Sequence, residues 1–293
     1  MFNKHSPEFK ERMLTCLQMD EYSDINALYF SGGVDSTTIL FALLELGRKP
    51  DLVSFELDGI LSKDRIIGSD IAKYYGLNYK CINIKCDKES VLSDIKTVLP
   101  YMKYPIKTHI QCSIPFLYMS KYLSSLGHTK SFTGMAADDI HGLSKIVNME
   151  YNLRGEESVR NMRSKTLYNA PRESDYDIWI VSKEFGGVIM KDPYRETHLT
   201  EWMLGVPYKE LHLERKKSIA VDAFSDYWKL DEKNWYRPGD SLQIVSGIRE
   251  LHDELLLKDP ILNKNNAKGI IAVYNNIRKS MLHDNSLDNF IEQ

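Results

Sequence analysis

The chain has 293 residues and nearly balanced charge, with 38 Lys and Arg against 41 Asp and Glu, so its formal net charge is −3. Hydrophobic residues make up 43% and charged residues 27%, which is typical of globular proteins and excludes a disordered tail, a fibre or a low-complexity linker. The charge also argues against a generic nucleic-acid binder, which would be strongly basic, although a local basic patch stays open.

Neither the N-terminus nor the cysteines indicate export or membrane insertion. No apolar signal core follows the first residues, and the most apolar stretch, residues 37–46, is much shorter than a membrane span. The cysteines form no C-x-x-C pair, and they are Cys16, Cys81, Cys86 and Cys112. We therefore expect small buried thiols in a protein of the reducing cytoplasm, with no membrane contact.

The first half of the sequence alternates short apolar runs with helical stretches. Strands are expected at residues 27–30, 52–57, 79–84 and 130–133, and helices at residues 36–46, 62–76, 88–99 and 113–126. Ser62 is a predicted helix cap, and Gly47 and Gly76 are predicted helix stops. This alternation predicts right-handed crossovers and an α/β fold, with a parallel sheet and flanking helices.

Two glycine-bearing loops, residues 31–36 and 134–142, directly follow predicted strands. In open parallel sheets, ligands bind beyond the carboxyl ends of the strands. The topology alone therefore predicts a ligand site that includes both loops.

The second half changes character near Tyr151 and is mainly helical, with helices expected after Pro193, at residues 242–257 and at residues 267–281. Residues 154–172 are polar and arginine-rich, which favours an exposed loop or a lid. We divide the chain into an N-terminal helical segment (1–20), an α/β core (21–150) and a helical region that completes the site (151–293).

The sharpest motif is Ser31-Gly32-Gly33-Val34-Asp35-Ser36, between a predicted strand and a predicted helix. Glycines allow the backbone to approach an anion, and the helix N-terminus supplies positive potential. Ser31 and Ser36 can donate hydrogen bonds to phosphate oxygens. Phosphate would repel Asp35, so its position suggests a divalent cation between them, for which Mg²⁺ is suited. The lysine-bearing Walker loop is absent from the sequence.

This hexapeptide resembles the PP-loop of the ATP pyrophosphatases, a superfamily that cleaves ATP between its α- and β-phosphates. Further segments, in the same order, resemble the synthetase domain of asparagine synthetases and β-lactam synthetases, and they are residues 54–79, 113–120, 133–142, 192–204 and 217–223. The resemblance implies an adenine nucleotide alpha hydrolase-like fold and binding of ATP and Mg²⁺.

The resemblance also assigns roles to individual residues. Those expected to bind ATP are Phe30, Ser31, Gly32, Gly33, Asp35, Ser36, Leu57, Thr133 and Gly134. Asp35 and Asp138 match the Mg²⁺-binding carboxylates, and Lys217 matches a catalytic lysine near the phosphates. Two plainer interpretations stay open. Lys217 lies in a basic run that solvent could surround, and Asp138 and Asp139 could cap a helix N-terminus.

Three positions depart from the family pattern. Phe2 stands where the glutaminase-containing relatives expose a cysteine, so nitrogen is expected from ammonia, another amine or a separate glutaminase. Met135 replaces a glutamate near the acyl-adenylate, and Asp139 or His141 could compensate as a catalytic group. Gly239 stands where a later lysine is expected. Four other histidines lack metal-ligand spacing and are interpreted as satisfied or surface groups, namely His109, His128, His198 and His212.

The resulting prediction is an ATP-dependent, asparagine synthetase-like ligase that adenylates a small-molecule carboxylate and transfers it to ammonia or an amine. Two alternatives are adenylation of a nucleobase or nucleoside, with residues 154–172 covering a nucleotide substrate, and a catalytically silent nucleotide-binding protein. A nucleic-acid substrate is not favoured, and the sequence leaves the oligomeric state open.

Overall fold

The computed structural model describes residues 2–102, 106–168, 173–230, 232–237, 242–263 and 268–283. Its centre is a parallel five-stranded sheet in the order β3-β2-β1-β4-β5. The strands are β1 (Ala27–Tyr29), β2 (Asp51–Leu57), β3 (Tyr79–Ile84), β4 (Lys130–Phe132) and β5 (Ile189–Lys191). The predicted α/β class and the four predicted strands are confirmed. The fifth strand was not predicted, because a run of three residues is too short to show a period.

The direction of strand order reverses at β1, since β2 pairs with one of its edges and β4 with the other. The loops that follow β1 and β4 therefore lie side by side at the carboxyl edge of the sheet. This is the topological switch point at which open α/β sheets bind ligands.

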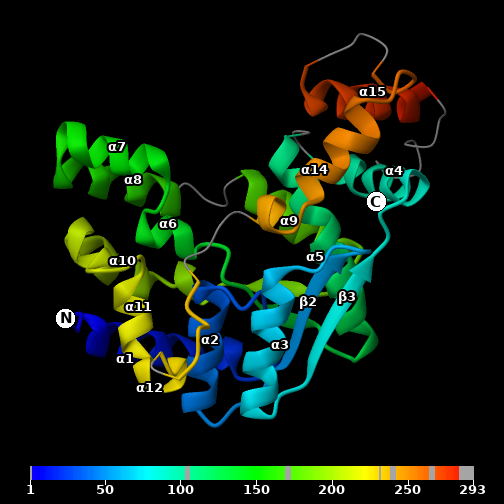
Figure 1. Ribbon diagram of the computed structural model, residues 1–293. Helices are drawn as coiled ribbons and strands as arrows, with labels where there is room; N and C mark the ends of the chain where they lie inside the picture. The colour runs from blue at the N-terminus through cyan, green and yellow to red at the C-terminus, as the bar shows by residue number, and fades with distance from the viewer. Residues whose placement is uncertain are drawn as a thin grey trace.

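Helices cover both faces of the sheet (Figure 1). On one face lie α2 (Val34–Glu45) and α3 (Lys63–Tyr75), and on the other α5 (Lys107–Ser125) and α9 (Glu173–Glu184). Alternation along β1 places Leu28 in the core cluster shared with α2, whereas Tyr29 joins the cluster containing Phe116 of α5. The strand is therefore apolar throughout, as expected for a parallel strand buried on both faces.

The helix ends follow the sequence signals. The Ser62 hydroxyl accepts a hydrogen bond from the Arg65 backbone N–H at the start of α3, and Gly76 ends that helix in a left-handed conformation. Helix α4 (Lys88–Val98) begins after its cap Asp87. Helix α5 begins six residues earlier than predicted and carries Pro115 inside it, so the proline marks no helix boundary here.

The N-terminal helix α1 (Ser6–Leu17) packs against α2 and also against α10 (Thr197–Gly205) and α11 (Ser218–Ala223). Buried Asn3 strengthens this contact, because its backbone N–H donates to the Asp222 carboxylate at 2.8 Å. The N-terminal helix thus shares one core with the sheet and with helices from residues 197–223. The division of the chain at residues 20 and 150 stays a prediction, and β5 joins the sheet from beyond the second boundary.

The prediction of a loop or lid at residues 154–172 is wrong over the part that the structure describes. That part contains the end of α7 (Lys145–Arg154) and all of α8 (Glu156–Tyr168), while residues 169–172 lie outside the described ranges. Val159, Arg163 and Leu167 are buried at a four-residue spacing. The Arg163 guanidinium therefore occupies a buried position between Val159 and Leu167. Because arginine is polar, the sequence does not show the apolar spacing that would predict a helix.

The remaining helices complete the second half. They are α6 (Ala137–His141), α12 (Ser225–Trp228), α13 (Leu242–Val245), α14 (Ile248–His252), a π-helical turn (Asp253–Leu257), α15 (Ile270–His283) and 3₁₀ turns at Asp20–Tyr22, Leu99–Tyr101, Pro193–Arg195 and Tyr208–His212. The single helix expected at residues 242–257 is broken where Gly247 adopts a φ of +79°.

The four cysteines are free, and in the described ranges no helix combines the length and apolarity that a membrane crossing needs.

Candidate active site

The loop between β1 and α2 is shaped by its glycines. Gly32 has a φ of +74°, which disfavours any residue with a Cβ. A Cβ at Gly32 would also lie 2.9 Å from the backbone nitrogen of Gly68 in α3. The loop therefore packs backbone to backbone on α3, and Gly68 is a residue of this site that the sequence reading missed.

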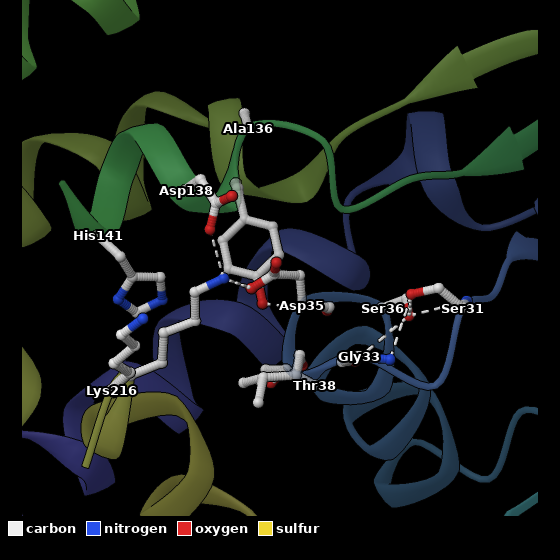
Figure 2. A network of polar contacts seen from close by, with 12 residues as sticks. Ser31, Gly33, Asp35, Ser36, Thr38, Ala136, Asp138, His141 and Lys216 are labelled. Atoms are coloured by element: carbon white, nitrogen blue, oxygen red, sulfur yellow. Dashed lines mark hydrogen bonds and ion pairs between the residues drawn. The ribbon is translucent and has the colours of Figure 1, made fainter. Parts of the chain in front are cut away.

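Within the loop, the two serines predicted to hold phosphate face each other. The Ser31 and Ser36 hydroxyl oxygens lie 3.3 Å apart, and the Ser31 hydroxyl also accepts from the Gly33 backbone N–H at 3.2 Å. Figure 2 shows these three residues together at the start of α2. Such hydroxyls and N–H groups at a helix N-terminus are suited to bind an anion.

The loop after β4 touches the first loop directly. A Cβ at Gly134 would lie 3.0 Å from the Asp35 Cβ and 3.2 Å from the Ser36 backbone nitrogen. At the next turn, the Ala136 backbone N–H donates to the Asp192 carboxylate at the end of β5, at 2.7 Å. The backbone carbonyl of Asp35 accepts a hydrogen bond from the buried Tyr194 hydroxyl at 3.2 Å. The loop after β1 and the segment after β5 therefore both contact the residues that lead into α6.

Lys217 joins the two carboxylates predicted to bind metal. Its ammonium donates to Asp35, and to the Asp138 Oδ1 at 2.6 Å. The Lys217 side chain is 0% exposed, so the interpretation as a solvated lysine is wrong. Its acidic partners also explain why a lysine survives burial, since a buried charge requires pairing.

Lys217, Asp35 and Asp138 form a charged triad, and the pKa of each depends on the charges of the others. Burial raises the pKa of Asp35 to about 6; the Lys217 ammonium opposes this shift, and the Asp138 carboxylate adds to it. Burial by itself lowers the pKa of Lys217, but the two carboxylates outweigh it and raise that pKa above its usual value. Lys217 therefore carries a full positive charge at neutral pH.

The residues present fit a Mg²⁺ ion bound jointly with phosphate. Because the Asp35 and Asp138 carboxylates both reach the Lys217 nitrogen, they converge on one small volume. Mg²⁺ typically takes one or two carboxylates, with phosphate oxygens and water as its other ligands. Within the described ranges, no group of three or more His, Cys, Asp or Glu side chains could hold a metal alone. The ion would therefore depend on the triphosphate.

Two histidines lie behind the triad. The Lys217 backbone N–H donates to the His212 Nδ1 at 3.1 Å, and the His212 Nε2 lies 2.9 Å from the His141 carbonyl oxygen. His141 is fully buried, and among the described residues neither of its ring nitrogens has a hydrogen-bond partner. Burial lowers the pKa of His141 well below its usual value, and the Lys217 charge lowers it further, so His141 is neutral.

A cavity of about 170 Å³ opens beside the loop after β1. Among the predicted ATP-binding residues, five side chains and the Gly134 backbone line it, namely Phe30, Ser31, Asp35, Ser36, Thr133 and Gly134. Residues that the sequence reading did not place in the site also line it, including Tyr29, Phe55, Phe116, Met119, Leu242 and Ser246. Those on β2 and α5 looked like ordinary core positions, and only the sheet topology brings them to the cavity.

Other predicted site residues lie apart from this cavity. Leu57 ends β2, but its side chain packs in a core cluster with Ile84 and Val91. Asp139 is buried in α6 and does not line the cavity, whereas Met135, which replaces the family glutamate, does. Asp139 therefore has no contact with the cavity through which to compensate for Met135, and His141 is likewise absent from its lining. The functional roles of Leu57 and Asp139 stay predictions.

One further ion pair lies at the cavity rim. Asp64 lines the cavity and pairs with Arg237, which directly precedes the segment with Gly239 in place of a lysine. Gly239 itself lies outside the described residues. The other histidines are satisfied as predicted. For example, His109 pairs with buried Asp177 at 2.7 Å, and His128 with Asp51 at 2.8 Å.

The fold and the loop after β1 place the protein in the PP-loop class of α/β proteins. A family model described as asparagine synthase matches residues 25–178, just over half of the chain, and the protein belongs to this family. It is therefore related to ATP-using enzymes of the PP-loop superfamily. The match contains both site loops, while Lys217 lies beyond it.

The chain is also similar to a 7-cyano-7-deazaguanine synthase from Thermoplasma acidophilum. The two are 28% identical over 125 residues, which cover 38% of this chain and 51% of the relative. The similarity thus spans about half of the relative's length.

Proposed function

We propose that the protein is an ATP-dependent ligase that adenylates a substrate carboxylate, releases pyrophosphate, and transfers the acyl group to ammonia or an amine. The observation that carries this proposal is the buried Lys217 ammonium between Asp35 and Asp138, next to the loop formed by residues 31–36. The reducing cytoplasm, where free thiols persist, is the proposed location.

In the proposed first step, a carboxylate oxygen of the substrate attacks the α-phosphorus of ATP and the bond to the pyrophosphate oxygen breaks. Negative charge accumulates on the phosphoryl oxygens and on the leaving pyrophosphate. The backbone N–H groups of residues 31–36 and the ammonium of Lys217 would stabilise that charge, and preorganised donors of this kind are the main means of catalysis in phosphoryl transfer. Mg²⁺ held by Asp35, Asp138 and the phosphates would neutralise further charge.

In the second step, ammonia or an amine attacks the acyl carbon, and AMP leaves with the electron pair of the broken acyl–oxygen bond. Met135 stands at the cavity where relatives have a glutamate, and a thioether cannot accept the proton of the attacking nitrogen. The attacking nitrogen would instead lose its proton to the leaving AMP phosphate or to water, and we expect ammonia as the donor, supplied freely or by a separate glutaminase.

A second candidate is adenylation of a nucleobase or nucleoside. Two observations favour it: the similarity to a protein named for a deazaguanine product, and the aromatic cavity wall formed by Tyr29, Phe55 and Phe116. Among the described residues that line the cavity, the charged ones are Asp35 and Asp64, both acidic. Such a wall suits a flat, uncharged ring better than an amino acid that carries its own carboxylate.

The test is product analysis. Purified protein is incubated with Mg²⁺, ammonium and ATP labelled at the α-phosphate, with panels of amino acids, aromatic carboxylic acids and purine bases or nucleosides that carry no carboxylate. The proposal requires AMP and pyrophosphate in equal amounts, dependent on an acceptor. ADP and phosphate would contradict the cleavage site, and no turnover with any acceptor would favour a silent nucleotide-binding protein.

The acceptor panel separates the two candidates. Turnover with aliphatic amino acids and not with purine analogues supports the ligase, and the reverse result supports the second candidate. Asp35→Asn serves as the inactive control, since it removes one of the carboxylates that face Lys217. Exposed Asp226→Asn is the matched variant that should keep full activity.

A further inference from the structure

A strained backbone underlies the buried ammonium. Lys217 has a φ of +56° and a ψ of 32°, the left-handed conformation, and it occupies the position before the first residue of α11. A residue with a Cβ pays about 1–2 kcal/mol for this conformation. Glu214, three residues earlier, is also left-handed, with a φ of 58°. Strain of this kind persists where surrounding contacts enforce it, and it is concentrated at functional sites.

The backbone of this strained residue contacts the imidazole of His212. The Lys217 backbone N–H donates to Nδ1 at 3.1 Å, so Nδ1 must be unprotonated. The ring proton therefore lies on Nε2, which donates to the His141 carbonyl oxygen at 2.9 Å. One side chain thus connects the lysine turn to the last residue of α6, the helix that carries Asp138.

We propose that His212 is a positioning residue that fixes the Lys217 turn through Nδ1, so that the ammonium meets the Asp138 carboxylate at the phosphates, while Nε2 only orients the imidazole against α6. The inference rests on the proposed function of Lys217 and extends it to a residue that does not contact the reacting atoms. The Arg163 guanidinium supports the same helix end, because it donates to the Ile140 carbonyl oxygen at 3.1 Å. His212 differs from Arg163 in that it also contacts the lysine backbone.

The hydrogen-bond pattern is maintained across the neutral range. Burial lowers the pKa of His212 to about 4; the hydrogen bond to His141 opposes this shift, and the nearby cations Lys217, Arg163 and Lys216 add to it. The rings of Tyr208 and His141 also face the imidazole. Nδ1 therefore stays an acceptor at the pH at which a cytoplasmic enzyme works.

Three substitutions separate the two hydrogen bonds of His212. His212→Asn keeps an acceptor near the position of Nδ1, His212→Gln keeps a donor near that of Nε2, and His212→Phe keeps only the ring. We expect kcat for AMP formation to fall roughly 100-fold in the Phe and Gln variants and by no more than about fivefold in the Asn variant, as displacements near 1 Å do. KM for ATP should change less than kcat, because the lysine acts mainly on the transition state.

His128→Asn is the matched control, since His128 pairs with Asp51 at the opposite end of β2. Circular dichroism and thermal melting verify that each variant folds. Retention of the wild-type kcat by His212→Phe, or equal losses in the Asn and Gln variants, would overturn the proposal. Should His212→Phe fail to fold, the contrast between Asn and Gln decides.

Hydrogen exchange of the Lys217 amide provides a readout that needs no catalysis. Protection should persist in His212→Asn and disappear in His212→Gln, and equal protection in both would also overturn the positioning role. A wild-type protein that forms no AMP with any acceptor would contradict the proposed function alone. The amide measurement would then decide the positioning role by itself.

Discussion

The two sides of the site are built in different ways. The loop of residues 31–36 is one continuous hexapeptide in which glycine backbone and serine hydroxyls form the proposed phosphate-binding loop, and its hydrogen bonds are local. Lys217 opposes it across Asp35, but its position depends on His212, on Asp138 and on a left-handed turn. A cradle of backbone N–H groups can be encoded locally, whereas a buried cation needs partners that lie 182 and 79 residues away along the chain.

The largest expected effect tests the side of the site that carries the Lys217 ammonium. Lys217→Met keeps most of the side-chain volume and removes the charge, so we expect the rate of AMP formation to fall by roughly 1,000-fold, the upper range for loss of one electrostatic donor. Lys216→Met changes the exposed neighbouring position, where a charge contributes little. Its rate of AMP formation should stay within about twofold of wild type. Similar rates in the two variants would show that the buried ammonium plays no part in the reaction.

The next effect tests the backbone side. Gly32→Ala introduces a Cβ at a φ of +74° and 2.9 Å from the Gly68 nitrogen, and we expect the free energy of unfolding to fall by about 3 kcal/mol. Gly59→Ala is the matched control, because Gly59 has a φ of +76° and nothing within 4 Å of the added atom. Its cost should be about 1 kcal/mol, from strain alone. Urea denaturation measures both, and equal losses would contradict the close packing on α3.

Acidification should lower the free energy of unfolding that neutral His212 contributes next to Lys217. In the unfolded chain His212 titrates near its usual pKa of 6.5, whereas in the folded protein burial lowers that pKa to about 4. The unfolded state therefore binds the proton first, so the stability from His212 is complete above pH 6.5 and is lost as the pH falls toward 4. Between pH 7 and pH 5 we expect a loss of about 1–2 kcal/mol.

The difference between wild type and His212→Asn isolates this contribution. Subtraction is needed because burial raises the pKa of Asp35 to about 6, which gives a pH dependence of opposite sign in the same range. Unfolding in urea at both pH values should show a smaller loss on acidification in the variant. An identical loss would show that His212 is protonated equally in the folded and unfolded states.

The smallest expected effect tests the contact between the two loops. Gly134→Ala places a Cβ 3.0 Å from that of Asp35, and a small shift of the loop can relieve this, so we expect a loss of roughly fivefold in kcat with little change in melting temperature. Gly205→Ala meets nothing within 4 Å and should be neutral in single-turnover measurements of AMP formation. A neutral Gly134→Ala would mean that the two loops move independently.

The local features of the fold could be predicted from the sequence. The strands at residues 27–30 and 79–84, the cap at Ser62 and the stop at Gly76 each depend on a few adjacent residues, and the structure agrees with them. The prediction of a loop at residues 154–172 failed because a side chain there is buried although its residue type is usually exposed. Arg163 is polar but buried, and it donates to the Ile140 and Met203 carbonyl oxygens at two helix ends. Polarity alone therefore made a helix look like a loop.

By itself, the sequence determined the shape of the loop that we propose binds phosphate, since the geometry of residues 31–36 follows from glycine backbone freedom and a strand–helix junction. Only the tertiary structure decided that Lys217 is buried rather than solvated, that Leu57 packs away from the cavity, and that His212 supports the lysine turn. The physical reason is the distance along the sequence over which each feature is set. Backbone conformation is set by neighbouring residues, whereas the desolvation of a charge depends on every segment packed around it.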